Sequence, residues 1–163
     1  MKRPWNRIDL PVYSVSSKAD DEENMNIVTY CSAVSMDPKQ YIVALYKQTK
    51  SLALVKQNPH FVLQLLHESQ YRMVTLLGQQ SGFEVNKMER LHKRRLLDYW
   101  KGFAILKEAI ALIEVKATAL VHDPSIPAPD HELFLCTVIS YKNVREGKAL
   151  STKTLRDKKI VRM

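Results

Sequence analysis

Two runs of β-branched and aromatic residues stand on either side of an Asp37-Pro38 dipeptide. The first run covers residues 24–36 and the second covers residues 41–47. Such residues favour extended strands, and Asp followed by Pro favours a turn because Pro fixes φ at the position it occupies. The pattern therefore predicts two antiparallel strands joined at Asp37-Pro38, and it restricts the chain to folds that contain an antiparallel sheet.

A helix is predicted directly after the second strand. The polar turn 48–51 leads into the apolar run 52–57, and Thr49 stands where a helix N-cap is expected, beside Lys50 and Ser51. Free backbone N–H groups at a helix start, together with a cation and two hydroxyls, favour an anion such as phosphate. An ordinary helix cap also accounts for Thr49, so both interpretations stay open.

The second half of the chain contains a long apolar strand pattern. Apolar residues occupy both alternating sets of positions in 132–145, which predicts a strand buried on both faces. The other segments are expected to form an acidic loop (18–23), a helix that Gly78 ends (68–77), a loop with a short helix (81–101) and a basic polar tail (150–163). Apolar strands with few short helices favour a closed barrel with helical cover.

The order of these features resembles the flavin reductase-like family. The first half of the family pattern is matched by Asn26, Thr29, Ser35, Asp37, Pro38, Thr49, Ser51 and the run 61–65. The second half is matched by Leu77-Gly78-x-x-Ser81-Gly82, Lys87, Ala109-x-Ala111-x-x-Glu114 and Asp130-His131-x-Leu133-Phe134. The chain departs from the pattern at Ser32, where many relatives carry Trp, and at Cys136, where Gly is usual.

The resemblance implies a mainly β fold with short helices. This fold would be an FMN-binding split β-barrel of Greek-key topology, formed by one domain over residues 1–163 and paired as a homodimer. The resemblance also implies a strand at 111–121, although the Ala and Glu residues there would by themselves favour a helix. In the homodimer, a second copy would cover the apolar outer strands, and the basic tail would lie toward the partner's cleft.

The resemblance further implies FMN as cofactor and NAD(P)H as a candidate electron donor. The implied cofactor-binding residues are Asn26, Val28, Thr29, Tyr30, Cys31, Ser32, Thr49, Lys50, Ser51, Ser81, Gly82 and Lys87. His131 is the implied catalytic residue, placed near the flavin or the nicotinamide. No metal site is expected, and the sequence does not identify an electron-acceptor protein.

Composition narrows the function classes. No apolar run approaches the roughly 20 residues that span a bilayer, and the N-terminus lacks an apolar signal segment, so a cytoplasmic protein is expected. Cys31 and Cys136 lie in apolar runs and are expected to be buried thiols.

The net charge of +8 includes eight Lys/Arg against two acids in 142–163. Such charge could bind nucleic acid, but no recognition motif accompanies it, so this partner is not expected.

Three functions stay open from the sequence: a reductase that passes hydride from NAD(P)H to flavin, an electron carrier without a nicotinamide step, and a basic nucleic-acid-binding barrel. The chain has only four glycines and no dinucleotide fingerprint. A nicotinamide would therefore bind by stacking on the flavin and by charge, not in a domain of its own.

Overall fold

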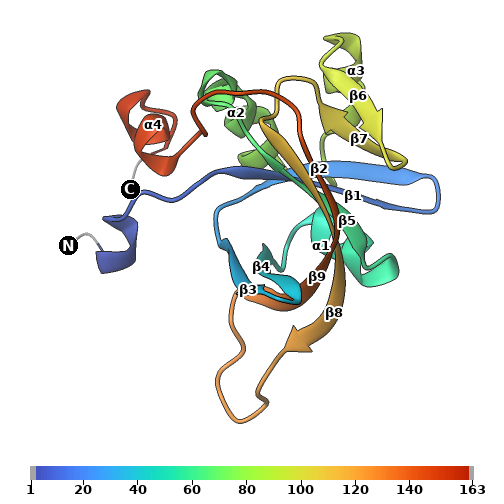
Figure 1. Cartoon of the computed structure of the whole chain (residues 1–163), viewed down its shortest axis with the longest axis vertical. Coiled ribbons are helices and arrows are strands. Elements are labelled where there is room, and N and C mark those ends of the chain that lie inside the picture. The colour runs from blue at the N-terminus through green and yellow to red at the C-terminus, as the bar shows by residue number, and fades with distance from the viewer. Residues whose placement is uncertain (1–2, 162–163) are drawn as a thin grey trace.

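The computed structural model describes residues 3–161, and one seven-stranded antiparallel sheet dominates it. The strand order is β2-β1-β5-β8-β9-β4-β3, and a separate hairpin pairs β6 with β7 (Figure 1). The strands are β1 (Tyr13–Ala19), β2 (Glu22–Val28), β3 (Cys31–Met36), β4 (Lys39–Tyr46), β5 (His60–Leu65), β6 (Leu97–Trp100), β7 (Phe103–Leu106), β8 (Ala111–Val121) and β9 (His131–Asn143). The predicted mainly β architecture is confirmed.

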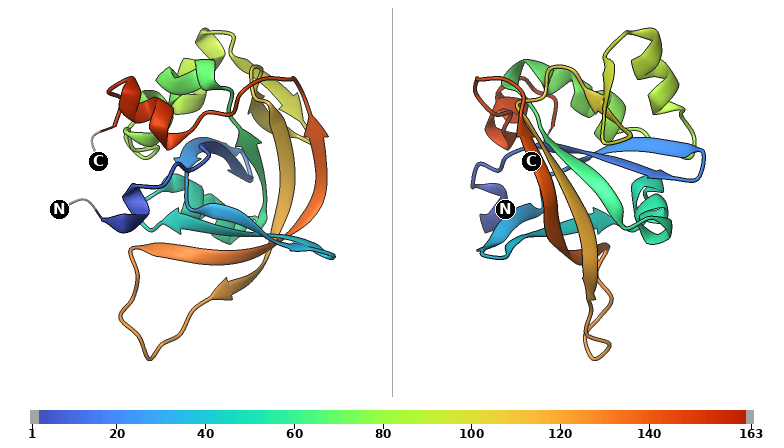
Figure 2. Two further views of the ribbon diagram at one scale, coloured as in Figure 1. Left: turned by 60° about the vertical axis from the view of Figure 1, so that its left-hand side comes forward. Right: turned by 45° about the vertical axis from the view of Figure 1, so that its right-hand side comes forward.

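The two edge strands of this sheet meet through a very short connection. Only Thr29 and Tyr30 separate β2 from β3, although the two strands lie at opposite edges of the strand order. A two-residue link spans only about 7 Å, so the sheet must curl until its edges come together. The Ala44 N–H donates a 2.9 Å hydrogen bond to the Tyr30 carbonyl and ties the link to β4. Figure 2 shows this curvature and the protruding β8–β9 loop.

Short helices cover the sheet. They are η1 (Pro4–Asn6), α1 (Lys50–Gln57), η2 (Glu68–Arg72), α2 (Met73–Gly78), α3 (Lys87–Lys93) and α4 (Thr152–Asp157). Helices α2, α3 and α4 lie at the end of the molecule opposite the β8–β9 loop (Figure 1). Within residues 3–161, no helix has the length and apolar character needed to cross a membrane.

The predicted turn at Asp37-Pro38 is confirmed, but the first predicted run, 24–36, divides into two strands: β2 pairs with β1, and only β3 pairs with β4. Met36 pairs with Lys39 across a turn made by Asp37-Pro38, whose peptide bond is cis. Thr49 caps α1, and β8 has the predicted bounds 111–121. Turn chemistry and capping act over a few residues, which explains why the sequence predicted these features well.

The described residues form three apolar clusters, and the two larger ones position the site. One fills the inside of the curled sheet and includes Val15, Val43, Phe61, Leu63 and Val115, all fully buried. The other joins β2 to the helical end and includes Met25, Leu66, Leu77, Leu91 and Leu150. The second cluster therefore positions the segment between α2 and α3 against β2.

The predicted loop at 18–23 is wrong. Lys18 pairs with Glu23 and Ala19 with Glu22, so these residues belong to a tight hairpin that turns at Asp20. Asp20 has φ +50°, a conformation that Asp tolerates better than most residues. The charged side chains suggested a loop, but their backbone groups pair in the ladder.

The predicted polar tail is also wrong over its described part. Residues 152–157 form α4, and Leu150 and Leu155 are buried in the second cluster. Leu10 and Thr152 exchange two hydrogen bonds, of 3.0 and 2.9 Å, which attach this segment to the N-terminal part of the chain. Arg162 and Met163, the end of the predicted tail, lie outside the described residues.

Three other segments differ from the predictions. The helix expected at 68–77 divides into η2 and α2, and the loop expected through residue 101 contains β6. In β9, Phe134 and Cys136 are buried, whereas Ile139 is 48% and Tyr141 61% exposed. The prediction of burial on both faces therefore fails for the single chain, because one face is partly buried at its start and exposed from Ile139 onward.

Candidate functional site

A groove opens between β2, the start of α1 and the segment that joins α2 to α3. Its larger part, about 540 Å³, is lined by Asn24, Asn26, Ile27, Tyr46, residues 48–50, residues 78–82, Glu84, Lys87 and His131. A smaller part, about 300 Å³, is lined by residues 26–30, residues 44–46 and His131. Asn26, Tyr46 and His131 line both parts, so we treat them as one central groove.

The central groove brings together most of the predicted site residues. They are Asn26, Val28, Thr29, Tyr30, Thr49, Lys50, Ser81, Gly82, Lys87 and His131. Residues far apart in the sequence meet here because α1 packs on β1 and β2 and because β4 pairs with β9. Their roles toward a ligand stay predictions.

Three predicted residues do not line this groove. Ser51 is fully buried, and Ser32 is exposed on β3, where its hydroxyl donates to the Ala33 carbonyl. Cys31 is partly buried, and burial, with a smaller effect from Cys136, raises the pKa of its thiol to about 12. Both thiols are free.

The start of α1 contributes polar groups to the groove. The Thr49 hydroxyl accepts a 3.3 Å hydrogen bond from the Leu52 N–H and donates one of 2.7 Å to the Tyr46 carbonyl. Next to it, the Lys50 ammonium lies 2.6 Å from a Glu22 carboxylate oxygen. The first-turn N–H groups, the hydroxyl and the ammonium together form a potential anion site.

Asn24 connects this helix start to the segment before α3. Its side-chain amide donates a 3.0 Å hydrogen bond to the Ser51 hydroxyl, and both side chains are buried. A Cβ at Gly82 would lie 2.5 Å from the Asn24 Oδ1 atom. Gly82 is therefore needed for the close approach of its segment to β2, which closes one side of the groove.

Lys87 places a buried cation at the groove. Its side chain is only 2% exposed, and its ammonium donates a 2.5 Å hydrogen bond to the Leu77 carbonyl. Burial lowers its pKa to about 8. An ammonium has three donors, and the described structure gives this one a single acceptor, so it can bind a further anionic or carbonyl oxygen.

His131 stands at the centre of the groove. Its ring centroid lies 5.3 Å from that of Tyr30 and 5.3 Å from that of Tyr46, both in tilted arrangements. Its Nδ1 lies 2.7 Å from an Asp130 carboxylate oxygen, and this hydrogen bond lowers the pKa of Asp130. The neighbouring aromatic rings and the carboxylate together fix the orientation of the imidazole.

Sequence reasoning missed several lining residues, among them Tyr46, Gln48 and Glu84. Tyr46 and Gln48 immediately precede the Thr49 cap, so their position between a strand end and a helix start was an available signal. Glu84 had no such signal, because only the packing of its segment on β2 brings it to the groove.

A curled antiparallel sheet with a polar, cation-bearing groove at a helix start defines a small, mainly β protein suited to an anionic ligand. The chain belongs to the flavin reductase-like domain family, whose model matches residues 5–156. A diflavin flavoprotein (A 2) of Nostoc sp. (strain PCC 7120) is 25% identical over 147 residues, which are 85% of this chain and 23% of that protein. The chain thus spans less than a quarter of that relative.

Solved structures share the fold at low identity. An FMN-binding protein from Thermus thermophilus with bound 1-cyclohex-2-enone has a TM-score of 0.73 and 19% identity, covering 88% of this chain and 75% of that one. The styrene monooxygenase flavin reductase of Pseudomonas putida S12 has a TM-score of 0.72 and 18% identity, covering 93% and 91%. BorF, the flavin reductase component of a bacterial two-component tryptophan halogenase, has a TM-score of 0.76 and 14% identity, covering 93% and 90%.

Proposed function

We propose that the chain binds FMN in the central groove and passes hydride or electrons from NAD(P)H to an acceptor. The observation that carries this proposal is the meeting of the α1 start, Lys50 and the buried Lys87 with the polar face of β2 in one groove. FMN, when bound, supplies the reversible two-electron redox chemistry. The residues present fit such a ligand, since the Lys87 ammonium is buried and keeps donors free.

The two ends of the groove differ in chemistry. Thr49, Lys50 and Lys87 supply donors and positive charge, which suit the phosphate. The other end, lined by residues 26–30 and His131, offers backbone groups, the Asn26 amide and aromatic side chains, which suit the flavin ring and its polar edge. In this arrangement His131 faces the ring region and positions the nicotinamide or holds a proton near it.

The similar proteins support the proposed class, a flavin-dependent oxidoreductase. The similar structures include an FMN-binding protein, a styrene monooxygenase flavin reductase and the flavin reductase component of a two-component tryptophan halogenase. A soluble flavin reductase that delivers reduced flavin to a separate enzyme would agree with these relatives. A flavin carrier without a nicotinamide step is the neighbouring alternative, and hydride transfer from NADH or NADPH distinguishes the two.

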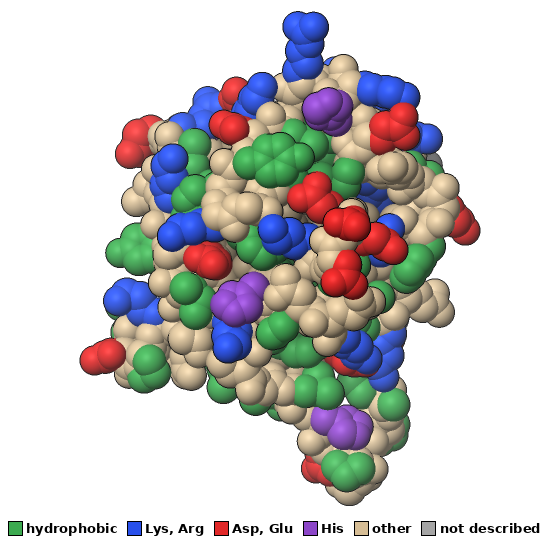
Figure 3. Space-filling model, turned by 90° about the vertical axis from the view of Figure 1, so that its right-hand side faces the viewer, with side chains coloured by type: hydrophobic (Ala, Val, Ile, Leu, Met, Phe, Trp, Pro, Cys, Tyr) green, Lys and Arg blue, Asp and Glu red, His purple; other side chains and the backbone are tan. Residues whose placement is uncertain are grey.

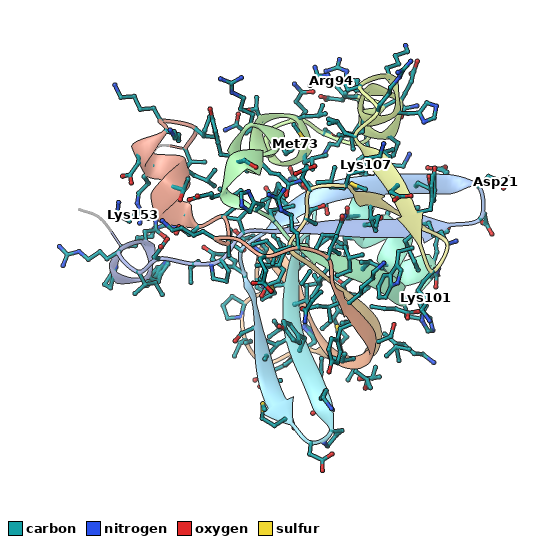
Figure 4. The ribbon with its side chains drawn as sticks, turned by 45° about the horizontal axis from the view of Figure 1, so that its top comes forward. Asp21, Met73, Arg94, Lys101, Lys107 and Lys153 are labelled. Carbon is teal, nitrogen blue, oxygen red and sulfur yellow. The ribbon has the colours of Figure 1, made fainter. Side chains whose placement is uncertain are left out.

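A nucleic-acid-binding function has less support. Figure 4 shows Lys153, on α4, well apart from Arg94, Lys101 and Lys107, which belong to the segment of α3 and the β6–β7 hairpin. Phosphate-backbone binding requires several cations along one surface. The basic composition therefore indicates a solvated surface that attracts anionic ligands at long range.

We further propose a homodimer. An apolar cleft of about 300 Å³ lies between β3, β4, β8 and β9, and nearby Met36 and Tyr141 are 86% and 61% exposed. A twofold contact would cover this surface.

The proposed function is tested by adding FMN to purified protein and measuring flavin absorption, followed by anaerobic mixing with NADH or NADPH. We expect a yellow complex whose flavin absorption bleaches on reduction. A protein that binds neither FMN nor any other flavin contradicts the proposal, and a yellow protein that neither nucleotide reduces supports the carrier alternative.

A further inference from the structure

The β6–β7 hairpin forms a small two-stranded sheet beside α3, separate from the seven-stranded sheet (Figure 1). Lys101 and Gly102 join its strands, with φ angles of +54° and +77°. Two successive positive φ angles are typical of a tight two-residue hairpin turn. Among the described strands, β6 and β7 pair only with each other, so the outer edge of each strand is left for other contacts.

The outer edge of β7 is satisfied inside the protein. The Ser16 hydroxyl of β1 donates a 2.6 Å hydrogen bond to the Ala104 carbonyl, and the Gln64 side-chain oxygen of β5 accepts one of 2.6 Å from the Leu106 N–H. All four residues are buried. Polar side chains of the main sheet therefore take the place of a third strand beside β7.

The outer edge of β6 has no such cover. The Lys107 N–H donates to the Leu96 carbonyl, and hydrogen-bonded and non-hydrogen-bonded pairs alternate along an antiparallel ladder. Leu97 and Tyr99 therefore belong to non-hydrogen-bonded pairs, and their N–H and C=O groups point away from β7. In the described part of the chain, only the Tyr99 N–H among these four groups has a partner, the Asp98 Oδ1 atom at 2.8 Å. An extended segment can add to such an edge as a further strand.

Exposed cations stand beyond both ends of this edge. Arg94 and Arg95 precede β6 and Lys101 follows it, and Figure 4 shows Arg94 and Lys101 at its two ends. Over residues 3–161, no carboxylate lies within ion-pair distance of these three side chains. Figure 3 shows further Lys and Arg side chains projecting from the upper end of the molecule, where α3 lies. This charge repels the same edge of a second copy and attracts a segment that carries carboxylates.

We propose that β6 binds an extended, acidic segment of a partner protein, which adds to the hairpin as a third strand. The backbone of the segment pairs with Leu97 and Tyr99, and its carboxylates contact Arg94, Arg95 and Lys101. The Tyr99 ring, 60% exposed, offers an apolar contact to alternate side chains. Nucleic acid fits less well, because it cannot extend a ladder of amide and carbonyl groups. None of these residues lines the central groove, so the proposal does not depend on flavin binding.

The test titrates the full chain into a fluorescent peptide of alternating Glu and Val and records the anisotropy. We expect saturable binding that weakens with added salt. The same peptide with N-methylated backbone amides keeps its charge but cannot pair, and a peptide of alternating Lys and Val lacks carboxylates, so neither should bind. Equal binding of the N-methylated peptide, or no binding of the Glu-Val peptide, overturns the proposal. Tighter binding of a single-stranded oligonucleotide would assign this surface to nucleic acid instead.

Two triple variants test the cations. Combining Arg94→Gln, Arg95→Gln and Lys101→Gln should weaken binding of the Glu-Val peptide by roughly 3- to 150-fold, since each exposed ion pair contributes a modest factor. The matched control removes the same charge from exposed positions away from β6, through Arg7→Gln, Lys116→Gln and Lys158→Gln, and should retain the affinity. Equal losses in the two triple variants would show that only net charge matters, which contradicts a site at β6.

Amide hydrogen exchange locates the bound peptide. The Leu97 N–H should exchange rapidly in the free protein, and peptide at about ten times its dissociation constant should slow it by about tenfold. The Asp98 and Trp100 N–H groups face β7 and should change little. Unchanged exchange at Leu97 in the presence of bound peptide overturns pairing at this edge.

Discussion

The Asn24 side-chain amide donates a 3.0 Å hydrogen bond to the Ser51 hydroxyl, and this bond joins β2 to the first turn of α1 inside the protein. Gly82 packs against the same Asn24 side chain from the other side. The two sides of the central groove are thus held by one buried asparagine, although neither Asn24 nor its bond to Ser51 was predicted as part of the site.

Gly82→Ala should destabilise the protein by about 1–3 kcal/mol, because its Cβ would clash with Asn24 and displace the bond to Ser51. Urea unfolding measures the loss. In an Asn24→Ala background the same substitution should cost clearly less, because the clashing amide is gone. An equal cost in both backgrounds would show that the contact with Asn24 is not the cause.

Thr49→Ala should weaken FMN binding toward the lower end of a roughly 10- to 150-fold range. The lower end is expected because the Thr49 hydroxyl already donates to the Tyr46 carbonyl, a bond with which a phosphate would compete. FMN titration measures the change.

Two variants serve as controls. The Thr49→Ser variant should bind FMN normally. Ser151→Ala removes the comparable cap of α4, about 1 kcal/mol of stability, and should leave FMN affinity unchanged. Unaltered affinity in Thr49→Ala would move the phosphate toward Lys87.

Lys87 should make stability rise with pH. Burial lowers its pKa from 10.5 to about 8, so between these values the unfolded chain holds a proton that the folded chain has released. The unfolding free energy of the wild type, relative to Lys87→Met, should therefore increase by on the order of 1–3 kcal/mol from pH 7.5 to 10. Urea unfolding at several pH values tests this.

The buried thiols make stability fall as the pH rises, but both proteins retain them, so their effect cancels when the two are compared. If the unfolding free energy of the wild type relative to Lys87→Met stays constant or falls as the pH rises, the Lys87 ammonium is not buried as the structure has it.

His131→Ala should slow flavin reduction by NADH by about 10²-fold at saturating nucleotide, if the imidazole acts at the reacting groups. FMN affinity should change less than the rate, because the phosphate donors Thr49, Lys50 and Lys87 are unaltered. Stopped-flow reduction kinetics separate the rate from nucleotide binding. His131→Gln retains a side chain of similar reach and should be less impaired. A normal rate in His131→Ala would leave the residue with a packing role between Tyr30 and Tyr46.

The wild type should sediment as a dimer at low micromolar concentration, because the exposed apolar surface around Tyr141 needs a partner. Tyr141→Lys should shift it toward monomer by introducing two like charges near a twofold contact. Tyr99→Lys places the same charge on β6 and should not affect the assembly. A wild-type monomer that still holds flavin would rule out the dimer.

The sequence by itself determined the features that depend on neighbouring residues. The Asp37-Pro38 hairpin and the Thr49 cap appeared as predicted, because turn and cap chemistry act within a few residues. The family pattern also predicted β8 with its observed bounds, whereas helix propensity alone would have predicted a helix there.

Only the tertiary structure decided which side chains face the groove. Ser51 lies two residues after the Thr49 cap, where a phosphate-binding residue is expected, yet its side chain is buried against Asn24. Lys87, in contrast, reaches the groove from a helix distant in the sequence. The open edge of β6 has the same kind of cause, because side chains from β1 and β5 satisfy β7 and leave β6 uncovered. Local sequence fixes backbone conformation, but the burial of a side chain depends on what long-range packing sets against it.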